Sequence, residues 1–176
     1  MNASEFEEAY EDDDGPRTRA EQELGEAILS APIRMLGPRP PVTVSPDTPV
    51  AEAIRLMLDE SIGAVLVVSD DKAVGIFTER DVLRRVVSGG LDRTRPVRDV
   101  MTEDPETLGL DDGIAFALNR MIIGGFRHVP IVDEKGAPQA VLSLREVVAF
   151  VVSLLPDRFL TLPPEPIHEA RSTDGG

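Results

Sequence analysis

An internal repeat is the feature of this sequence that most limits its fold. When residues 32–57 are placed on residues 96–121, 64 positions later, eight aligned positions carry the same residue. These are Pro32 and Pro96, Arg34 and Arg98, Pro41 and Pro105, Thr43 and Thr107, Asp47 and Asp111, Ala51 and Ala115, Ala53 and Ala117, and Met57 and Met121. Several other positions keep an apolar residue in both copies. The chain is therefore predicted to contain two copies of one supersecondary unit.

Each copy predicts the element order β-α-β-β-α. A short extended piece precedes an amphipathic helix, whose apolar residues recur at helical spacing. A strand that is apolar throughout follows, as expected where both faces of a sheet are covered. A second strand and a closing helix complete the unit. In the first copy these elements are predicted at 42–44, 50–58, 64–68, 74–77 and 80–87, and in the second at 106–108, 114–122, 128–132, 140–142 and 145–155.

One unit of roughly 60 residues buries too little surface to be stable alone. The sequence therefore predicts an α+β fold in which two β-α-β-β-α repeats pack about a pseudo-twofold axis. We expect the first repeat at residues 32–92 and the second at 93–155. A helix and linker are expected at 18–31, because Thr18 and Glu21 form a capping-box pattern. A disordered acidic tail is expected at 1–17, and a Pro-rich tail at 156–176.

Composition removes several classes of function. The chain has no cysteine, which excludes disulfides, thiolate metal sites and a cysteine nucleophile. Its net charge of −14 disfavours nucleic acid and anionic membranes as partners. No apolar run approaches the roughly 20 residues of a membrane helix, and no signal peptide is recognised. We therefore expect a cytoplasmic protein. Without a nucleophile–base pair or a metal-ligand cluster in the sequence, we expect no enzyme activity, no cofactor and no metal.

Specific motifs accompany the repeat. The stretch GIFTERD spans Gly75–Asp81, the lead-in Val-Met-Thr spans Val100–Thr102, and GGFRHVPIVDEKG lies in the second copy. Together with the repeat, these motifs resemble a tandem pair of cystathionine-β-synthase (CBS) domains, the Bateman module, over about residues 32–155. The resemblance implies two clefts between the repeats. In that family these clefts often hold adenine nucleotides or other adenosyl ligands, and modules commonly pair into a disc-like homodimer.

The pattern Thr78-x-x-Asp81 suits a nucleoside phosphate. Thr78 ends an apolar strand and precedes a helix, whose first N–H groups and partial positive charge favour phosphate. The Asp81 carboxylate can accept hydrogen bonds from both hydroxyls of a ribose. Gly75 and Ile76 would let a flat base approach the backbone. The alternative interpretation is a capping box, in which Thr78 and Asp81 satisfy the helix terminus alone. The two roles are compatible, and both remain open at this stage.

An anionic ligand in an acidic chain needs local cations. In proteins similar to this one, basic residues at the positions of Arg127 and His128, just before Pro130, reach the phosphate of a ligand held by the other copy. The resemblance therefore pairs these residues with Thr78 and Asp81. Alternatively, His128 is a partly buried histidine and Arg127 a surface charge. Thr43 and Val44 are candidates for the base site, or for core packing, and Pro130 is a further candidate ligand contact. Arg80 and Arg145 are expected on solvated helix faces.

The second copy departs from this pattern. Ala140 replaces the glycine, Ser143 keeps the hydroxyl, and Glu146 replaces the aspartate with a carboxylate one methylene longer. The basic pair is replaced by Gly63 and Ala64 in the opposing copy. We therefore expect one competent cleft and one weak cleft, the latter containing Thr107, Val141, Ser143 and Glu146.

The leading hypothesis is a regulatory module that binds AMP, ADP, ATP or a related adenosyl ligand and signals to an unidentified protein partner, acting as a homodimer. The alternative is a ligand-free structural and protein-interaction module. In that case Thr78 and Asp81 only cap a helix.

Overall fold

The computed structural model describes residues 25–27 and 30–154. The expected tails at 1–17 and 156–176 lie outside these residues. So does most of the expected N-terminal helix, of which 25–27 and Ser30 are helical. Within the described ranges, no helix is long and apolar enough to cross a membrane.

The first repeat is built on a four-stranded sheet in the order β1-β2-β3-β4, to which the second repeat contributes the last strand. β1 (Thr43–Val44) runs parallel to β2 (Ala64–Ser69), and β2 pairs antiparallel with β3 (Lys72–Thr78). On the far side of β3 lies β4 (Thr102–Glu103), also antiparallel, which the sequence did not predict. α3 (Val50–Asp59) and the segment after β3 supply residues to the core beneath the sheet, as Met57, Phe77 and Val86 pack in one cluster.

The closing helix of the first repeat is not a regular α-helix. It begins as α4 (Glu79–Asp81) and continues as a π-helical segment, η2 (Val82–Val87). The Ser88 N–H donates to the Leu83 carbonyl, five residues back, at 3.0 Å. Such π-helical turns are rare and frequently occur at functional sites.

The second repeat has the same helices but a smaller sheet. α5 (Ile114–Gly124), the hairpin of β5 (His128–Val132) and β6 (Pro138–Ser143), and α6 (Leu144–Leu154) follow the predicted order. α5 ends at the predicted glycine pair, where Gly125 adopts a left-handed φ of 64°. The predicted strand at 106–108 is reduced to a single bridge, in which Leu108 pairs in parallel with Ile131.

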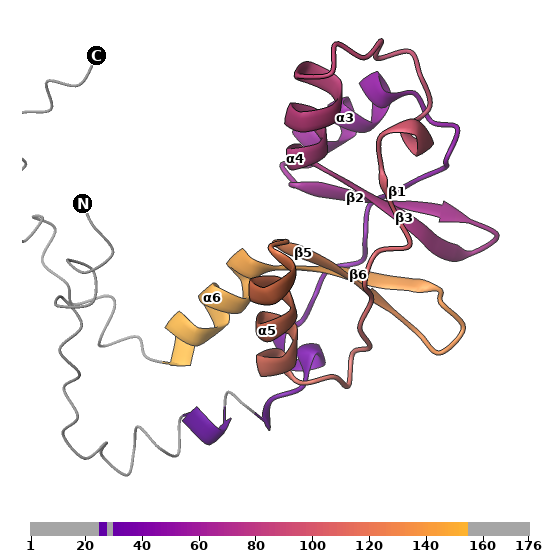
Figure 1. Ribbon diagram of the computed structural model, residues 1–176. Coiled ribbons are helices and arrows are strands. Elements are labelled where there is room, and N and C mark those ends of the chain that lie inside the picture. Colours follow the sequence, from indigo (N-terminus) through magenta and orange to yellow (C-terminus); the bar gives the residue numbers. More distant parts are fainter. Residues whose placement is uncertain (1–24, 28–29, 155–176) are drawn as a thin grey trace, which may run out of the picture.

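The segment that begins each repeat, called its lead-in here, packs in the core of the other repeat. η1 (Ile33–Leu36) begins the first repeat, yet Ile33 lies in one buried cluster with Ile114 and Val129. Figure 1 shows this short violet helix beside α5. Conversely, η3 (Val97–Asp99) brings Val97 into the cluster of the first repeat. Each hydrophobic core is therefore built from two segments that are distant in the sequence.

The exchange is reciprocal at the level of single hydrogen bonds. Backbone N–H groups of the two lead-ins donate to carbonyls of the opposite repeat, and the two sets of contacts differ by the same 64 positions as the repeat. The contacts are Ile33 to Asp112 and Arg34 to Leu110, both at 2.9 Å, and Val97 to Thr48 and Arg98 to Pro46, at 2.8 and 3.1 Å. Ion pairs join Arg34 to Asp111 and Arg98 to Asp47. The predicted α+β fold with two pseudo-symmetric repeats is confirmed.

The sheets of the two repeats face each other. Ala64 and Leu66 of β2 and Ile76 of β3 form a third buried cluster, against which Val141 of β6 packs. In Figure 1 the helices of each repeat lie away from the strands that meet at this junction. The junction places the end of β3 beside the beginning of β5, and these strand ends form the candidate site.

Candidate functional site

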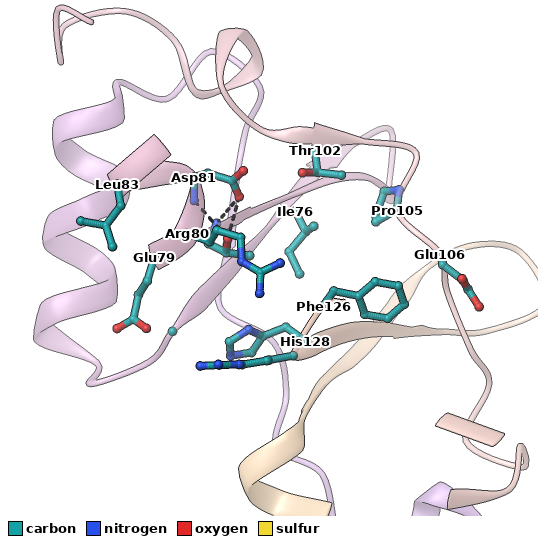
Figure 2. A pocket seen from close by; sticks show the side chains of 13 residues that line it. Ile76, Glu79, Arg80, Asp81, Leu83, Thr102, Pro105, Glu106, Phe126 and His128 are labelled. Atoms are coloured by element: carbon teal, nitrogen blue, oxygen red, sulfur yellow. Dashed lines mark hydrogen bonds between the residues drawn. The ribbon is translucent and has the colours of Figure 1, made fainter. Parts of the chain in front are cut away.

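A pocket of about 400 Å³ lies between the repeats, in the size range of small-molecule sites. Four segments line it: Gly63 before β2, the end of β3 with the helix that follows, the start of β5, and the chain that leads from β4 into the second repeat. Figure 2 shows their side chains converging from both repeats. Of the sequence-predicted residues, the pocket brings together Ile76, Thr78, Asp81, Arg127 and His128.

Thr78 and Asp81 form a complete capping box. The Thr78 backbone N–H and hydroxyl donate to Oδ2 of Asp81 at 2.9 and 2.7 Å. In return, the Asp81 N–H donates to the Thr78 hydroxyl at 3.4 Å. Asp81 is only 7% exposed, and in the described residues it is the one polar or charged residue that is buried. The predicted capping role is confirmed, and the same carboxylate faces the pocket.

The basic residues of the second repeat lie opposite this box. Arg127 is exposed, and His128 is half-buried at the first position of β5. A Cβ on Gly63 would lie 3.0 Å from Cε1 and Nε2 of the His128 ring, so the glycine leaves space for the imidazole. Burial lowers the pKa of His128, although the carboxylates of Glu79 and Glu146 oppose this shift. The ring is therefore held in a site that favours its neutral form.

Arg80 lies on an exposed helix face, and its side chain also reaches across the pocket. Its guanidinium donates to the Gly125 carbonyl, in the loop between α5 and β5. The exposure of Arg80 agrees with the predicted solvated helix face, but its contact with the opposite repeat was not predicted. The reason is the inter-repeat junction, which places the start of α4 beside that loop. Arg80 adds a third basic group to the side of the pocket that contains Arg127 and His128.

The sequence interpretation missed the wall formed by the lead-in of the second repeat. Thr102, Pro105 and Glu106 line the pocket from this segment, and Phe126 precedes the basic pair. Glu106 receives two hydrogen bonds from the Arg120 guanidinium of α5. This contact lowers the pKa of Glu106, and the matching contact raises that of Arg120. A signal for the position of this segment was in the sequence. Arg98 of the lead-in pairs with Asp47, which lies before the first helix of the other repeat.

Four predicted residues lie outside the lining of this pocket. Thr43 and Val44 belong to β1, which pairs with β2 and is separated by it from β3. Pro130 is buried in the middle of β5, opposite Val141 of β6. Gly75 lies beneath Met101, whose sulfur would be 2.4 Å from a Cβ at that position. In this structure the missing side chain of Gly75 therefore makes room for Met101. A ligand contact for these four residues stays a prediction.

The corresponding residues of the second repeat form a second capping box. The Ser143 N–H and hydroxyl both donate to Oε2 of Glu146 at 2.7 Å, and the Glu146 N–H donates back at 3.2 Å. Glutamate thus reproduces the cap that aspartate makes in the first repeat. Val141 packs against the cluster between the sheets, and Thr107 is exposed beside the Leu108 bridge.

Comparison with known proteins identifies the family. The model of the CBS domain matches residues 36–88 and 97–153, which correspond to the two repeats. The chain belongs to the CBS-domain family. The two domains together form a CBS pair, with the candidate site between them.

Relatives of this CBS pair occur in archaea. An uncharacterized 17.7 kDa protein of Acidianus ambivalens is 30% identical over 131 residues, which cover 74% of this chain and 76% of that protein. Longer relatives from Arabidopsis thaliana and Schizosaccharomyces pombe are matched over only 20% and 14% of their length. The activities of such larger proteins therefore do not transfer to this chain.

Solved structures share the fold. An uncharacterized conserved protein from Pyrococcus horikoshii is 31% identical, with a TM-score of 0.64 over 69% of this chain and 92% of that chain. A CBS domain protein from Pyrobaculum aerophilum, solved in complex with AMP, is 24% identical, with a TM-score of 0.63 over 70% and 99% of the two chains.

Proposed function

We propose that this CBS pair is a non-enzymatic regulatory module that binds AMP, ADP, ATP or a related adenosyl ligand in the inter-repeat pocket. One observation carries the proposal: the pocket brings Thr78 and Asp81 of the first repeat together with Arg127 and His128 of the second. An acidic group for ribose hydroxyls thereby faces basic groups for phosphate. The same fold accommodates AMP in the Pyrobaculum protein.

The chemistry of the pocket assigns a part of the ligand to each wall. The phosphate would lie beside Arg127 and His128, with Arg80 nearby. The ribose would lie at Asp81, and the base would pack on apolar groups such as Ile76 and Phe126. Phosphate at His128 would favour the protonated imidazole, so binding would be coupled to proton uptake and would strengthen as the pH falls.

Thermal unfolding of the full chain tests this function. Samples with AMP, ADP, ATP, NAD or S-adenosylmethionine are compared with the ligand-free protein. A ligand at about 100 times its dissociation constant adds roughly 2.7 kcal/mol of stability, a shift of about 5–10 °C for a chain of this size. The shift is expected to vanish in Asp81→Ala. Glu146→Ala is the matched control, because it removes the other capping box and Glu146 is not among the residues that line the proposed cleft.

A second function is favoured by the capping box itself. Oδ2 of Asp81 already accepts two hydrogen bonds from Thr78, which is the geometry expected if the residue only stabilises a helix terminus. Under this alternative the chain is a ligand-free structural and interaction module. No ligand in the panel would then raise the unfolding temperature, and Asp81→Ala and Glu146→Ala would have the same small effect on stability.

We further propose that two copies pair through their helices, and that the ligand state is passed to a partner protein through this assembly. Leu58 of α3 and Ile122 of α5 occupy equivalent positions and are 73% and 76% exposed. Leu83 and Val148 form a second equivalent pair that is also exposed. Apolar surface repeated about a pseudo-twofold axis suits a self-complementary contact with a second copy. Light scattering of the native chain and of Ile122→Glu tests the pairing: the native chain should be dimeric and the variant monomeric.

A further inference from the structure

The two carboxylate oxygens of Asp81 have different surroundings. Oδ2 accepts the two hydrogen bonds from Thr78. Oδ1 lies 3.5 Å from Nε of Arg85, one helical turn later in the segment. A carboxylate oxygen has two acceptor positions, and those of Oδ2 are both used by the cap. A ribose hydroxyl that donates to Asp81 must therefore use Oδ1, beside the Arg85 guanidinium.

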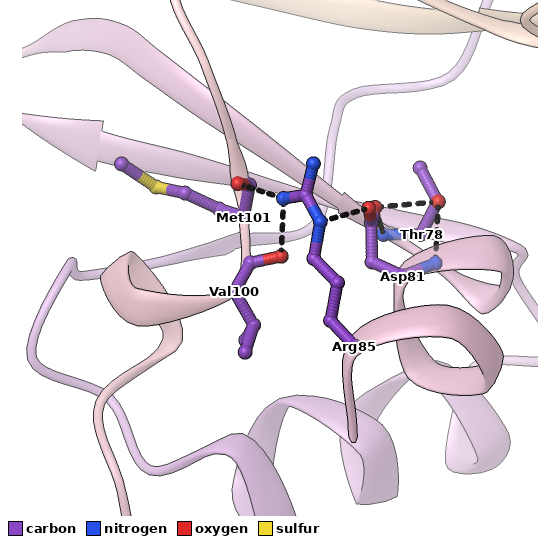
Figure 3. A network of polar contacts seen from close by, with 5 residues as sticks. All are labelled: Thr78, Asp81, Arg85, Val100 and Met101. Carbon is purple, nitrogen blue, oxygen red and sulfur yellow. Dashed lines mark hydrogen bonds and ion pairs between the residues drawn. The ribbon is translucent and has the colours of Figure 1, made fainter. Parts of the chain in front are cut away.

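The same guanidinium holds the lead-in of the second repeat. Nη1 of Arg85 donates to the Val100 carbonyl at 2.8 Å and to the neighbouring Met101 carbonyl. Figure 3 shows Arg85 between this segment and the Thr78–Asp81 box. The chain continues directly into Thr102, which pairs with Ile76 and lines the pocket. One side chain thus contacts both the candidate ribose acceptor and the segment that forms the pocket wall.

This network occurs at the first capping box and not at the second. The position in the second repeat that corresponds to Arg85 is Phe150, which packs against the hydrophobic core of that repeat. The segment that corresponds to Val100–Met101 is Leu36–Gly37. The capping box has therefore been kept in both repeats, whereas the arginine occurs beside only one of them.

We propose that Arg85 is a positioning residue for ribose recognition in the first cleft. It orients Oδ1 of Asp81 and at the same time fixes the wall that begins at Thr102, so the ligand diol meets a carboxylate of defined position. The inference rests on the proposed function and adds to it the residue that makes the Asp81 cleft selective for ribose. Because Arg85 is not among the residues that line the pocket, its effect on the ligand passes through Asp81 and the wall.

The test measures selectivity, which a general loss of stability does not change. Isothermal titration calorimetry of the full chain uses AMP and ATP as probes, each also in its 2′,3′-dideoxy form. The native chain is expected to prefer the ribose form by about ten- to a hundredfold, as charge-assisted hydrogen bonds to a diol allow. In Arg85→Ala this preference is expected to fall to about threefold or less, a difference well under one such hydrogen bond. The ratio of ATP to AMP affinity should stay constant, because the basic groups at the phosphate end are untouched.

Arg84→Ala is the matched control, since Arg84 is an exposed arginine on the same π-helical segment and does not line the pocket. Its ribose preference should equal that of the native chain. Arg85→Met keeps the aliphatic stem and replaces Arg85→Ala if the alanine variant does not fold. An unchanged ribose preference in the Arg85 variant overturns the inference and leaves the proposed function standing. If the native chain binds neither probe, the inference is wrong, and the proposed function is wrong for AMP and ATP.

Discussion

The two capping boxes of this CBS pair share one backbone geometry but differ in the residues that surround them. In both, a hydroxyl residue and a carboxylate three positions later exchange hydrogen bonds at a strand-to-helix turn. Only Asp81 of the first repeat, however, is paired with an arginine one turn later and faces basic residues across a pocket. The comparison teaches that the Thr-x-x-Asp pattern by itself specifies a helix start. A binding site additionally requires the opposite repeat.

The largest expected effect on stability comes from a substitution in one of the exchanged lead-ins. Ile33 is fully buried in the core of the second repeat, although it lies at the start of the first repeat in sequence. We expect Ile33→Ala to lower the free energy of unfolding by about 2–5 kcal/mol, because it leaves a cavity in that core. Urea denaturation measures the loss, and hydrogen exchange locates it. Increased exchange should appear first in α5 and β5.

Met35→Ala provides the control on the same 3-10 helix, because Met35 is 62% exposed and its removal leaves no cavity. If the Ile33 variant loosened α3 and β2 while α5 stayed protected, each lead-in would belong to its own repeat and the exchange would be wrong.

A smaller effect separates capping from ligand binding. Thr78→Ala and Ser143→Ala each remove the hydroxyl of one box, and each should cost about 0.5–2 kcal/mol of stability. Both losses are expected to be similar in chemical denaturation, because the two caps have the same geometry. Ligand affinity should fall only in Thr78→Ala. Equal weakening of ligand binding by both variants would show that the two boxes are functionally equivalent.

The smallest expected effect is the pH dependence contributed by His128, whose counterpart in the first repeat is Ala64. Burial lowers the pKa of His128 in the folded state from its usual value of 6.5. Below about pH 6.5 the unfolded chain therefore binds more protons than the folded chain, so this residue reduces stability as the pH falls through that value. In His128→Gln the decline in stability between pH 7.5 and pH 5.5 should be shallower. Parallel profiles for the native chain and the variant would contradict a buried, neutral imidazole.

The sequence was sufficient for those parts of the molecule that depend on local patterns. The repeat predicted the element order, and the resemblance to CBS pairs implied that Thr78, Asp81, Arg127 and His128 would meet. The lead-in exchange was not visible in this way, because apolar residues such as Ile33 and Val97 fit the core of either repeat equally well. Reciprocal placement of Arg34 and Asp111 was the available clue.

Other differences between the predicted and the observed structure also have physical causes. β4 forms because Thr102 and Glu103 can pair with β3, whereas the equivalent residues of the first lead-in are Pro38 and Arg39. Proline has no N–H to contribute to a strand pair. The pocket wall at Thr102–Glu106 and the role of Arg80 depend on how the repeats dock, and helical or strand periodicity contains no information about docking.

The central claim is that one cleft of the two is a binding site, and the stoichiometry of binding tests it most directly. Isothermal titration calorimetry with AMP and ATP counts the binding sites of the full chain. The native protein is compared with Asp81→Ala and Glu146→Ala. We predict one ligand per chain for the native protein and for Glu146→Ala, and at least about a tenfold loss of affinity in Asp81→Ala. Two ligands per chain, or a loss caused by Glu146→Ala in place of Asp81→Ala, would contradict the account.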